Sequence, residues 1–360
     1  WRSAAALAGV ATVAVTMRLG WHLTRSLWIA CLAGFLLAID GVHVVLSRVG
    51  LLDGFLTLFV SLGALFVWRD LASGSTPDTP LTSEIRTPSD ENPQNHPKLL
   101  KSPKLWWYSG PQEEHWAGQH EGHHAGHRAG HRTGHRTGRQ AGRLRWRRPW
   151  LLAAGLTFGA AAAIKWSGLY PLAVFLVAIV VVDVLRRYRA RDPHPLARGA
   201  LQALITGAIA LPAAAITYLA SWSGWIASPA AQNRKPGEPW WVSLWQWHAD
   251  ALAWHSTLSA PHPYQANPLT WPLALRPTAM YEARWAEGPG CGWAGGCVSA
   301  VSPLPNALVT WGGVVALLVL LWVVARSTWI AARQRPLTPL WQPAFGAAAV
   351  VLVGDLSGWL

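Results

Sequence analysis

The chain has 360 residues, of which 51% are hydrophobic and only 13% charged, with 25 tryptophans and a net charge of +13. Its long and frequent apolar runs exclude a soluble domain. We expect an all-α polytopic membrane protein, because helices satisfy their own backbone hydrogen bonds in lipid. The positive charges fall in short segments between apolar runs, which argues against a nucleic-acid partner.

Hydropathy predicts about eight membrane spans, each near the roughly 20 residues that cross a bilayer core. They cover 3–17, 27–46, 51–68, 150–165, 168–185, 199–222, 305–325 and 340–359. The predicted organisation is three spans in 1–69, an insertion in 70–147, three spans in 148–222, a loop in 223–304 and two spans in 305–360. The chain starts at Trp1 and stops at Leu360 inside apolar runs, so we expect a piece of a longer protein.

A short polar hinge, Ser47-Arg48-Val49-Gly50-Leu51-Leu52-Asp53, joins the second and third predicted spans. Asp40 lies about two helical turns before Arg48. Ionisable groups close to hydrocarbon are costly, and they mark either a functional site or a buried pair. The hinge therefore predicts a site near the membrane surface or an Arg–Asp clamp that sets the register of a helical hairpin, and the residues alone leave both open.

The basic residues segregate to alternate connections, which predicts the orientation in the membrane. The connections expected in the cytoplasm contain Arg18, Arg25, Arg69, Arg186, Arg187, Arg189, Arg191, Arg198, Arg326, Arg333 and Arg335. On this topology Arg48, Asp53, Lys165 and the 223–304 loop all lie on the extracytoplasmic side.

Residues 70–147 form a predicted cytoplasmic insertion, disordered and rich in Pro, Ser and acidic residues at its start. A four-residue repeat centred on His127, His131 and His135 follows. Its composition suits metal buffering or attraction to anionic headgroups, or else it is a slippage-generated tract without a site. Glycine in every repeat disfavours a stable helix, so we expect no rigid metal site.

The 223–304 loop is dense in Trp, His and Tyr. Between 239 and 258 the apolar residues recur at three- and four-residue steps, which predicts an amphipathic helix at the membrane surface. This helix either packs over the bundle or forms a lid on an external site. His248 and His255 share one face, but their spacing is not that of a zinc site. Cys291 and Cys297 predict a small-loop disulfide in an oxidising compartment.

Several sequence blocks carry a family resemblance through their order and spacing. They are Asp40-Gly41, Leu46-Ser47-Arg48 and Leu51-Leu52-Asp53; Arg148-Pro149-Trp150 and Ile164-Lys165-Trp166-Ser167-Gly168-Leu169-Tyr170; Tyr218-Leu219-Ala220-Ser221-Trp222-Ser223-Gly224-Trp225; and His262-Pro263-Tyr264-Gln265, Trp271-Pro272-Leu273 and Arg276-Pro277. Outside 70–145 the chain resembles the dolichyl-phosphate-mannose–protein O-mannosyltransferases, membrane-embedded glycosyltransferases of the GT-C type.

The resemblance implies transfer of mannose from a polyprenyl-phosphate-mannose donor to Ser or Thr hydroxyls of exported proteins, at the plasma membrane, with no cofactor or metal. A cation must neutralise the departing phosphate. Arg48 is the first candidate for this role and Lys165 the second, although Lys165 also suits snorkelling to the interface. Asp53 is expected to orient Arg48 or to cap its helix. Asp40 is a fallback for the general base.

Four residues of the 223–304 loop are expected either to contact the acceptor or sugar, or to build a rigid turn that packs on the bundle: His262, Tyr264, Trp271 and Arg276. The family's Asp-Glu pair, thought to include the base, would precede Trp1, so we expect the chain to be incomplete for catalysis. Ala266 replaces the family's usual Ser, and Pro305-Asn306-Ala307 replaces its Gly-Asn-Pro.

The alternatives are another transferase that uses a lipid-linked sugar, a transporter, or a metal-handling membrane protein. The His-Pro-Tyr and Trp-Pro-Leu blocks argue against the first. A transporter predicts internal repeats and spans broken near the midplane, and neither is clear in the sequence. The outer segments lack the carboxylate cluster that would hold Mg²⁺ beside a substrate phosphate.

Overall fold

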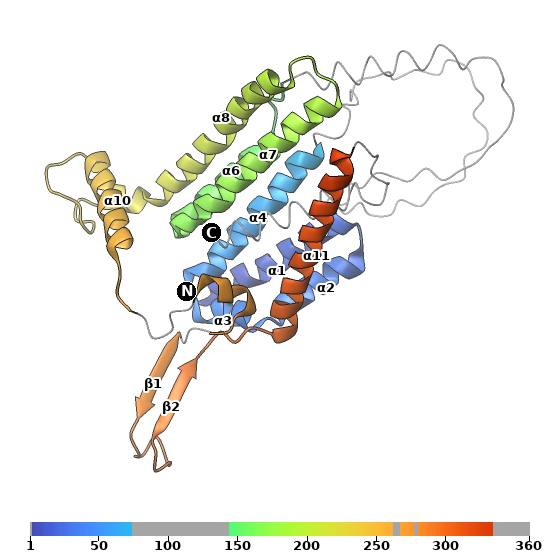
Figure 1. Ribbon diagram of the computed structural model, residues 1–360. Helices are drawn as coiled ribbons and strands as arrows, with labels where there is room; N and C mark the ends of the chain where they lie inside the picture. The colour runs from blue at the N-terminus through green and yellow to red at the C-terminus, as the bar shows by residue number, and fades with distance from the viewer. Residues whose placement is uncertain (1, 74–143, 262–266, 277–279, 334–360) are drawn as a thin grey trace, which may run out of the picture.

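A computed structural model of the chain describes residues 2–73, 144–261, 267–276 and 280–333. Its helices are α1 Arg2–Thr24, α2 Leu27–Ala38, α3 Gly41–Val49, α4 Leu52–Ser73, α6 Pro149–Ile164, α7 Leu169–Arg189, α8 Pro195–Ser221, α9 Ser223–Ala227, α10 Trp240–Thr257 and α11 Ala307–Ala332. Two short 3₁₀ helices, η1 Trp166–Gly168 and η2 Pro268–Leu273, and two strands, β1 Tyr281–Trp285 and β2 Cys297–Val301, complete the described part (Figure 1).

The described residues contain five helices that are long and apolar enough to cross a membrane, or six if the bent pair α2 and α3 counts as one span. The protein is therefore a multi-pass helical membrane protein, as the composition predicts. The short helix α6 is apolar and lies among these spans, between α4 and α8. The predicted span at 340–359 and the repeat around His131 lie outside the described residues.

The predicted span over 27–46 is broken, because the chain bends by 60° between α2 and α3. Asp40 starts the new helix: its Oδ2 accepts a hydrogen bond from the backbone N–H of His43 at 3.1 Å. Its Oδ1 accepts another from the N–H of Asn306 at 3.1 Å. At Gly41, a Cβ atom would lie 1.9 Å from the carbonyl oxygen of Leu304, so only glycine permits this close approach.

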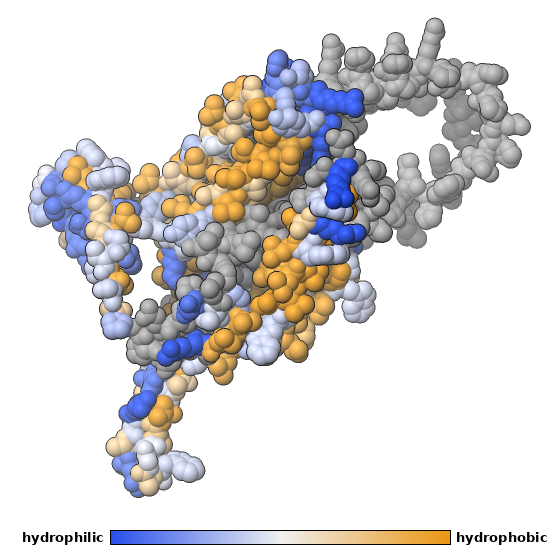
Figure 2. Space-filling model, in the orientation of Figure 1, coloured by the Kyte–Doolittle hydropathy of each residue, from blue (hydrophilic) through white to orange (hydrophobic). Residues whose placement is uncertain are grey.

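The core lies where α6 packs between α4 and α8, around Phe158, Phe175 and Ile179, each at most 1% exposed. Glycine lets α6 and α8 approach closely. A Cβ atom at Gly159 would lie 2.4 Å from the carbonyl oxygen of Ala214. Small residues four apart are a common means of packing helices in membranes. The outer helix faces remain apolar, as the orange surface in Figure 2 shows, and they suit contact with lipid.

A buried polar cluster joins three helices at the end of the bundle where α4 and α7 finish. Arg148 is 3% exposed and donates from Nε to both carboxylate oxygens of Asp70, at 3.1 and 3.2 Å. Its Nη1 donates to Asp183 at 3.1 Å and to the hydroxyl of Thr206 at 2.8 Å. The cluster therefore fixes α4, α7 and α8 around the start of α6.

The turn between α7 and α8 lies at this same end. Asp192 accepts hydrogen bonds from Arg198 at 2.9 Å and from the backbone N–H of His194 at 3.0 Å. The backbone N–H of His194 and the charges of Arg198 and Arg187 lower the pKa of the Asp192 carboxyl. Arg186 donates to the carbonyl oxygen of Leu71 at 2.7 Å, which ties the turn to α4. Predicted cytoplasmic arginines therefore gather at one end of the bundle.

The opposite end carries α10 and a β-hairpin, as Figure 1 shows. The predicted amphipathic helix is α10. The hairpin adds a small sheet to a fold expected to be entirely helical: β1 and β2 are antiparallel, with Tyr281 opposite Val301 and Trp285 opposite Cys297. Cys291 and Cys297, the expected pair, are joined by a disulfide with 5.7 Å between their Cα atoms.

Candidate functional site

Lys165 marks the hairpin-bearing end of the bundle. It is the C-cap residue of α6, and its extended backbone separates α6 from η1. Its ammonium forms an ion pair with Asp53 in the first turn of α4. Both side chains stay accessible, at 50% and 38% exposure. An accessible lysine at a membrane surface can still bind an anion, because the ammonium has three N–H donors.

Of the two roles expected of Asp53, the ion pair argues against the orientation of Arg48, because Asp53 pairs with Lys165 and not with Arg48. Arg48 lies in the last turn of α3 and is exposed, and no other described residue pairs with its guanidinium. Gly50 follows in the left-handed conformation with φ of 78° and ends the helix. This turn separates Arg48 from Asp53 by a change of chain direction, so their closeness in sequence does not make them partners.

Asp40 has a structural position. Both of its carboxylate oxygens accept backbone hydrogen bonds, one from His43 and one from Asn306. Each oxygen keeps a second acceptor site, but the two bonds fix the carboxylate to the backbone of two segments. Asp40 therefore holds the α2–α3 break against the segment that precedes α11.

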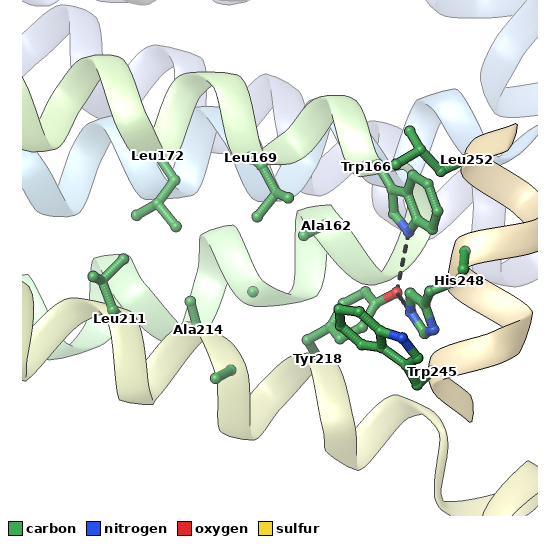
Figure 3. A pocket seen from close by; sticks show the side chains of 13 residues that line it. Ala162, Trp166, Leu169, Leu172, Leu211, Ala214, Tyr218, Trp245, His248 and Leu252 are labelled. Carbon is green, nitrogen blue, oxygen red and sulfur yellow. Dashed lines mark hydrogen bonds between the residues drawn. The ribbon is translucent and has the colours of Figure 1, made fainter. Parts of the chain in front are cut away.

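Trp166, the residue that follows Lys165, lines a cavity of about 530 Å³ (Figure 3). Its lining is almost entirely apolar and comes from four helices and η1: Gly159, Ala162, Trp166, Leu169, Leu172, Leu211, Ala214, Ala215, Tyr218, Trp245, His248, Ala249 and Leu252. Trp245 is 75% exposed and Leu211 52% exposed, so the cavity is open at the apolar surface of the bundle. Its size and lining suit a hydrocarbon chain.

The polar atoms of the cavity gather at one place. Figure 3 shows Trp166, Tyr218 and His248 in hydrogen-bond contact, from η1, α8 and α10. Trp166 Nε1 donates to the hydroxyl of Tyr218 at 3.1 Å, and that hydroxyl lies 2.6 Å from His248 Nε2. The rings of Trp166 and His248 also stack, with 5.6 Å between centroids and 9° between planes. These three residues form one edge of an otherwise apolar site.

Comparison with known proteins shows which family the sequence resembles. The sequence profile of the dolichyl-phosphate-mannose-protein mannosyltransferase family matches residues 1–77. The chain is 31% identical over 385 residues to the polyprenol-phosphate-mannose–protein mannosyltransferase of Mycolicibacterium smegmatis, covering 100% of this chain and 60% of that protein. The Mycobacterium tuberculosis protein of the same name is 30% identical over 380 residues, covering 100% of this chain and 59% of that protein.

Along its whole length the chain is therefore similar to polyprenol-phosphate-mannose–protein mannosyltransferases. Its relative in Corynebacterium glutamicum, which has the same name, is 24% identical over 348 residues, covering 89% of this chain and 56% of that protein. The chain thus spans about three fifths of the length of the curated relatives it matches. No solved structure is similar enough to match it.

The remaining residues that sequence analysis assigned to an acceptor site are only partly placed. Trp271 lies in η2 and is 54% exposed, and Arg276 follows it on an exposed segment. The indole of Trp311 in α11 donates to the carbonyl oxygen of Leu273 at 3.3 Å, which anchors η2 to that helix. His262 and Tyr264 lie outside the described residues.

Sequence analysis missed the partnership of Tyr218 with His248. Each residue had a signal in the sequence: Tyr218 is the first residue of one of the family blocks, and His248 lies on the apolar stripe of the predicted amphipathic helix. No spacing rule connects them, because 30 residues of loop and helix separate the two. In the described part of the chain no group of three or more His, Cys, Asp or Glu residues is placed to hold a metal ion.

Proposed function

We propose that this chain carries the donor site of a polyprenyl-phosphate-mannose–protein mannosyltransferase, which transfers mannose to Ser or Thr hydroxyls of exported proteins. One observation carries the proposal. Lys165 and Trp166 are consecutive, the first an accessible cation at the bundle end and the second part of the apolar cavity wall. A lipid-linked sugar phosphate needs both features, a cation for its phosphate and an apolar cavity for its hydrocarbon chain.

The chemistry gives Lys165 a defined task. In the transfer, the bond between the sugar's anomeric carbon and the phosphate oxygen breaks, and the acceptor hydroxyl oxygen bonds to that carbon. The phosphate leaves with the bonding electrons, so its negative charge grows as the bond breaks. A fixed cation stabilises this developing charge more than it stabilises the bound donor. The hydrogen bond to Asp53 orients the ammonium of Lys165, and the other two N–H groups of that ammonium can face the phosphate.

Arg48 is the second proposed phosphate ligand. Its guanidinium is exposed on the last turn of α3, close in the chain to the start of α4, where Asp53 lies. Arg keeps its charge near lipid and can bind two phosphate oxygens at once. The hydroxyl proton of the acceptor passes to a general base, and neither Asp40 nor Asp53 is assigned that role here because both carboxylates are engaged.

We place the Lys165 end of the bundle on the extracytoplasmic face of the plasma membrane. The arginines around Arg148 and Arg186 lie at the other end, and cytoplasmic ends of membrane helices are the ones enriched in Arg and Lys. The disulfide of the hairpin belongs to an oxidising compartment. On this face Trp271 and Arg276 are the proposed contacts for the acceptor polypeptide, together with His262 and Tyr264.

Donor binding tests the proposal directly. The full chain, purified into lipid nanodiscs, is titrated with polyprenyl phosphate and with the uncharged polyprenol of the same length. We expect the phosphate to bind more tightly, and Lys165→Ala to weaken phosphate binding about tenfold or more, with no effect on the polyprenol. Lys165→Arg should retain most of the binding.

Arg284→Ala provides the matched control, because Arg284 is an exposed cation of the same bundle end that pairs with Glu282 on β1. Its removal lowers the local positive charge equally but should leave phosphate binding unchanged. Equal binding of the phosphate and the alcohol by the unmodified chain would refute the phosphate site. Transfer of labelled mannose to a Ser/Thr-rich peptide in membranes, by a protein of the relatives' full length, is the second readout.

A further inference from the structure

Helix α10 is attached to the bundle at one place. In the described chain, the contact between Tyr218 and His248 is the only hydrogen bond that joins α10 to another helix. The rings of Trp222 and Trp247, 4.7 Å apart, add an edge contact beside it. Most of α10 otherwise remains exposed, and Ser243 and Leu244 are its buried residues. The position of α10 therefore depends on a few side chains around His248.

The partners of His248 determine which of its ring nitrogens donates a hydrogen bond and which accepts one. Its Nδ1 lies 2.7 Å from the carbonyl oxygen of Leu244, which can only accept, so Nδ1 carries the proton. In the neutral ring Nε2 then accepts, and the Tyr218 hydroxyl donates to it. The Tyr218 oxygen in turn accepts from Trp166. Each polar atom in this chain of hydrogen bonds is used, which gives η1, α8 and α10 a defined relative position.

That position decides whether the cavity has an outer wall. Trp245, His248, Ala249 and Leu252 all line the cavity, and their spacing places them on one face of α10. The facing walls come from α6, α7 and α8, as Figure 3 shows for Ala162, Leu172 and Leu211. If α10 moved away, the cavity would become an open groove between α7 and α8.

We infer that His248 is a positioning residue for the lipid part of the donor: its hydrogen bond to Tyr218 fixes α10 as the outer wall of the cavity. The inference rests on the proposed function and makes binding of the prenyl chain depend on α10. A prenyl chain in the cavity contacts Leu252 and Trp245 on α10. A phosphate without a prenyl chain does not enter the cavity, so its binding near Lys165 does not depend on the wall.

The test compares a ligand with a prenyl chain and one without it in nanodiscs. Undecaprenyl phosphate and methyl phosphate are titrated into the full chain and its variants. We expect His248→Leu and Tyr218→Phe to weaken undecaprenyl phosphate binding up to about tenfold, the range of one net hydrogen bond, and to change methyl phosphate binding less than about twofold. His248→Gln keeps an acceptor close to the Nε2 position and should restore most of the undecaprenyl phosphate binding.

His255→Leu is the matched control. His255 lies two turns further along α10, is exposed, and its ring contacts the neighbouring Trp254. The variant removes an imidazole from the same helix without touching the bundle, so binding of both ligands should stay unchanged. Amide hydrogen exchange over 240–257 gives a second readout, and it should become faster in His248→Leu and not in His255→Leu.

The outcomes separate this inference from the proposed function. Equal weakening of both ligands by His248→Leu would overturn the inference, since it would place His248 at the phosphate. Unchanged undecaprenyl phosphate binding in a variant whose α10 exchanges faster would also overturn it. Undecaprenyl phosphate binding that is unchanged in Lys165→Ala but weakened in His248→Leu would refute the phosphate site of the proposed function and leave the role of His248 standing.

Discussion

Arg148 and Asp70 form a buried ion pair that connects the start of α6 to the end of α4. The same two helices are paired at their other ends by Lys165 and Asp53. In each helix the two charged residues are 17 positions apart, which corresponds to about 26 Å of helix, close to the thickness of a hydrocarbon core. The antiparallel pair α4–α6 is thus fixed at both membrane surfaces.

The two ion pairs differ in environment, and this difference predicts different energetics. Removing one partner of a buried pair leaves an uncompensated charge and costs about 3 to 5 kcal/mol. We therefore expect Arg148→Leu, which strands both Asp70 and Asp183, to lower the free energy of unfolding by this amount. The neighbouring Arg147 is exposed, and Arg147→Leu should change it by less than about 0.5 kcal/mol. Unfolding in mixed detergent micelles measures both variants, and similar values would show that the cluster is not a stabilising clamp.

Lys165 and Asp53 should contribute little to stability, because both are accessible. Exposed ion pairs are worth about 0 to 1 kcal/mol. A double-mutant cycle with Lys165→Ala and Asp53→Ala should therefore give a coupling free energy in unfolding of less than about 1 kcal/mol. A coupling above about 2 kcal/mol would mean that the pair is structural, and loss of donor binding in Lys165→Ala would then reflect damage to the fold.

The outline of the bundle was predictable because apolar runs report directly on helices in lipid. The break between α2 and α3 was not, although its cause is visible. Asp is a good helix-capping residue, but a charged residue inside an apolar run suggests a functional site. The capping role of Asp40 became clear only from the fold, in which the backbone N–H of Asn306, far along the chain, donates to its carboxylate. The β-hairpin was missed because its two strands have only five residues each and are largely exposed, so neither stands out from the surrounding loop.

The site was predictable in its residue types and not in its pairs. The sequence placed Arg48, Asp53 and Lys165 on one side of the membrane, and the structure brings Asp53 and Lys165 together. The choice of partner depends on the packing of α4 against α6, which no local spacing encodes. For the same reason His248 was weighed as a metal ligand, whereas its partner is the hydroxyl of Tyr218.

Asp40 offers a test that separates a structural carboxylate from a catalytic one. We expect Asp40→Ala to destabilise the protein by about 1 to 2 kcal/mol, because it removes the cap of α3 and the contact with Asn306. Ser26→Ala removes the cap of α2 alone, where the hydroxyl accepts from Ile29 at 3.4 Å, and should cost less. Asp40→Asn keeps a capping oxygen and, in a protein of the relatives' full length, should retain mannose transfer in membranes. Abolished transfer by a stable Asp40→Asn variant would instead identify Asp40 as the base.

Glycine packing between α6 and α8 gives the last prediction. A Cβ atom at Gly159 would lie 2.4 Å from the backbone oxygen of Ala214, and backbone atoms cannot move aside as a flexible side chain does. Gly159→Ala should therefore force the helices apart and cost about 1 to 3 kcal/mol of unfolding free energy. It should also weaken binding of a long prenyl phosphate, because Gly159 and Ala214 both line the cavity.

Gly207 in α8 is the matched control for that substitution. Its nearest neighbour to an added Cβ atom is the end of Leu211 at 3.8 Å, an ordinary contact. Gly207→Ala should therefore be neutral or stabilising by up to about 1 kcal/mol, because alanine favours a helix interior. The two substitutions add the same methyl group to helices that pack against each other. If both substitutions change the free energy of unfolding in micelles by the same amount, then the close contact at Gly159 does not hold α6 against α8. Other contacts between these helices must then position the cavity wall that they form.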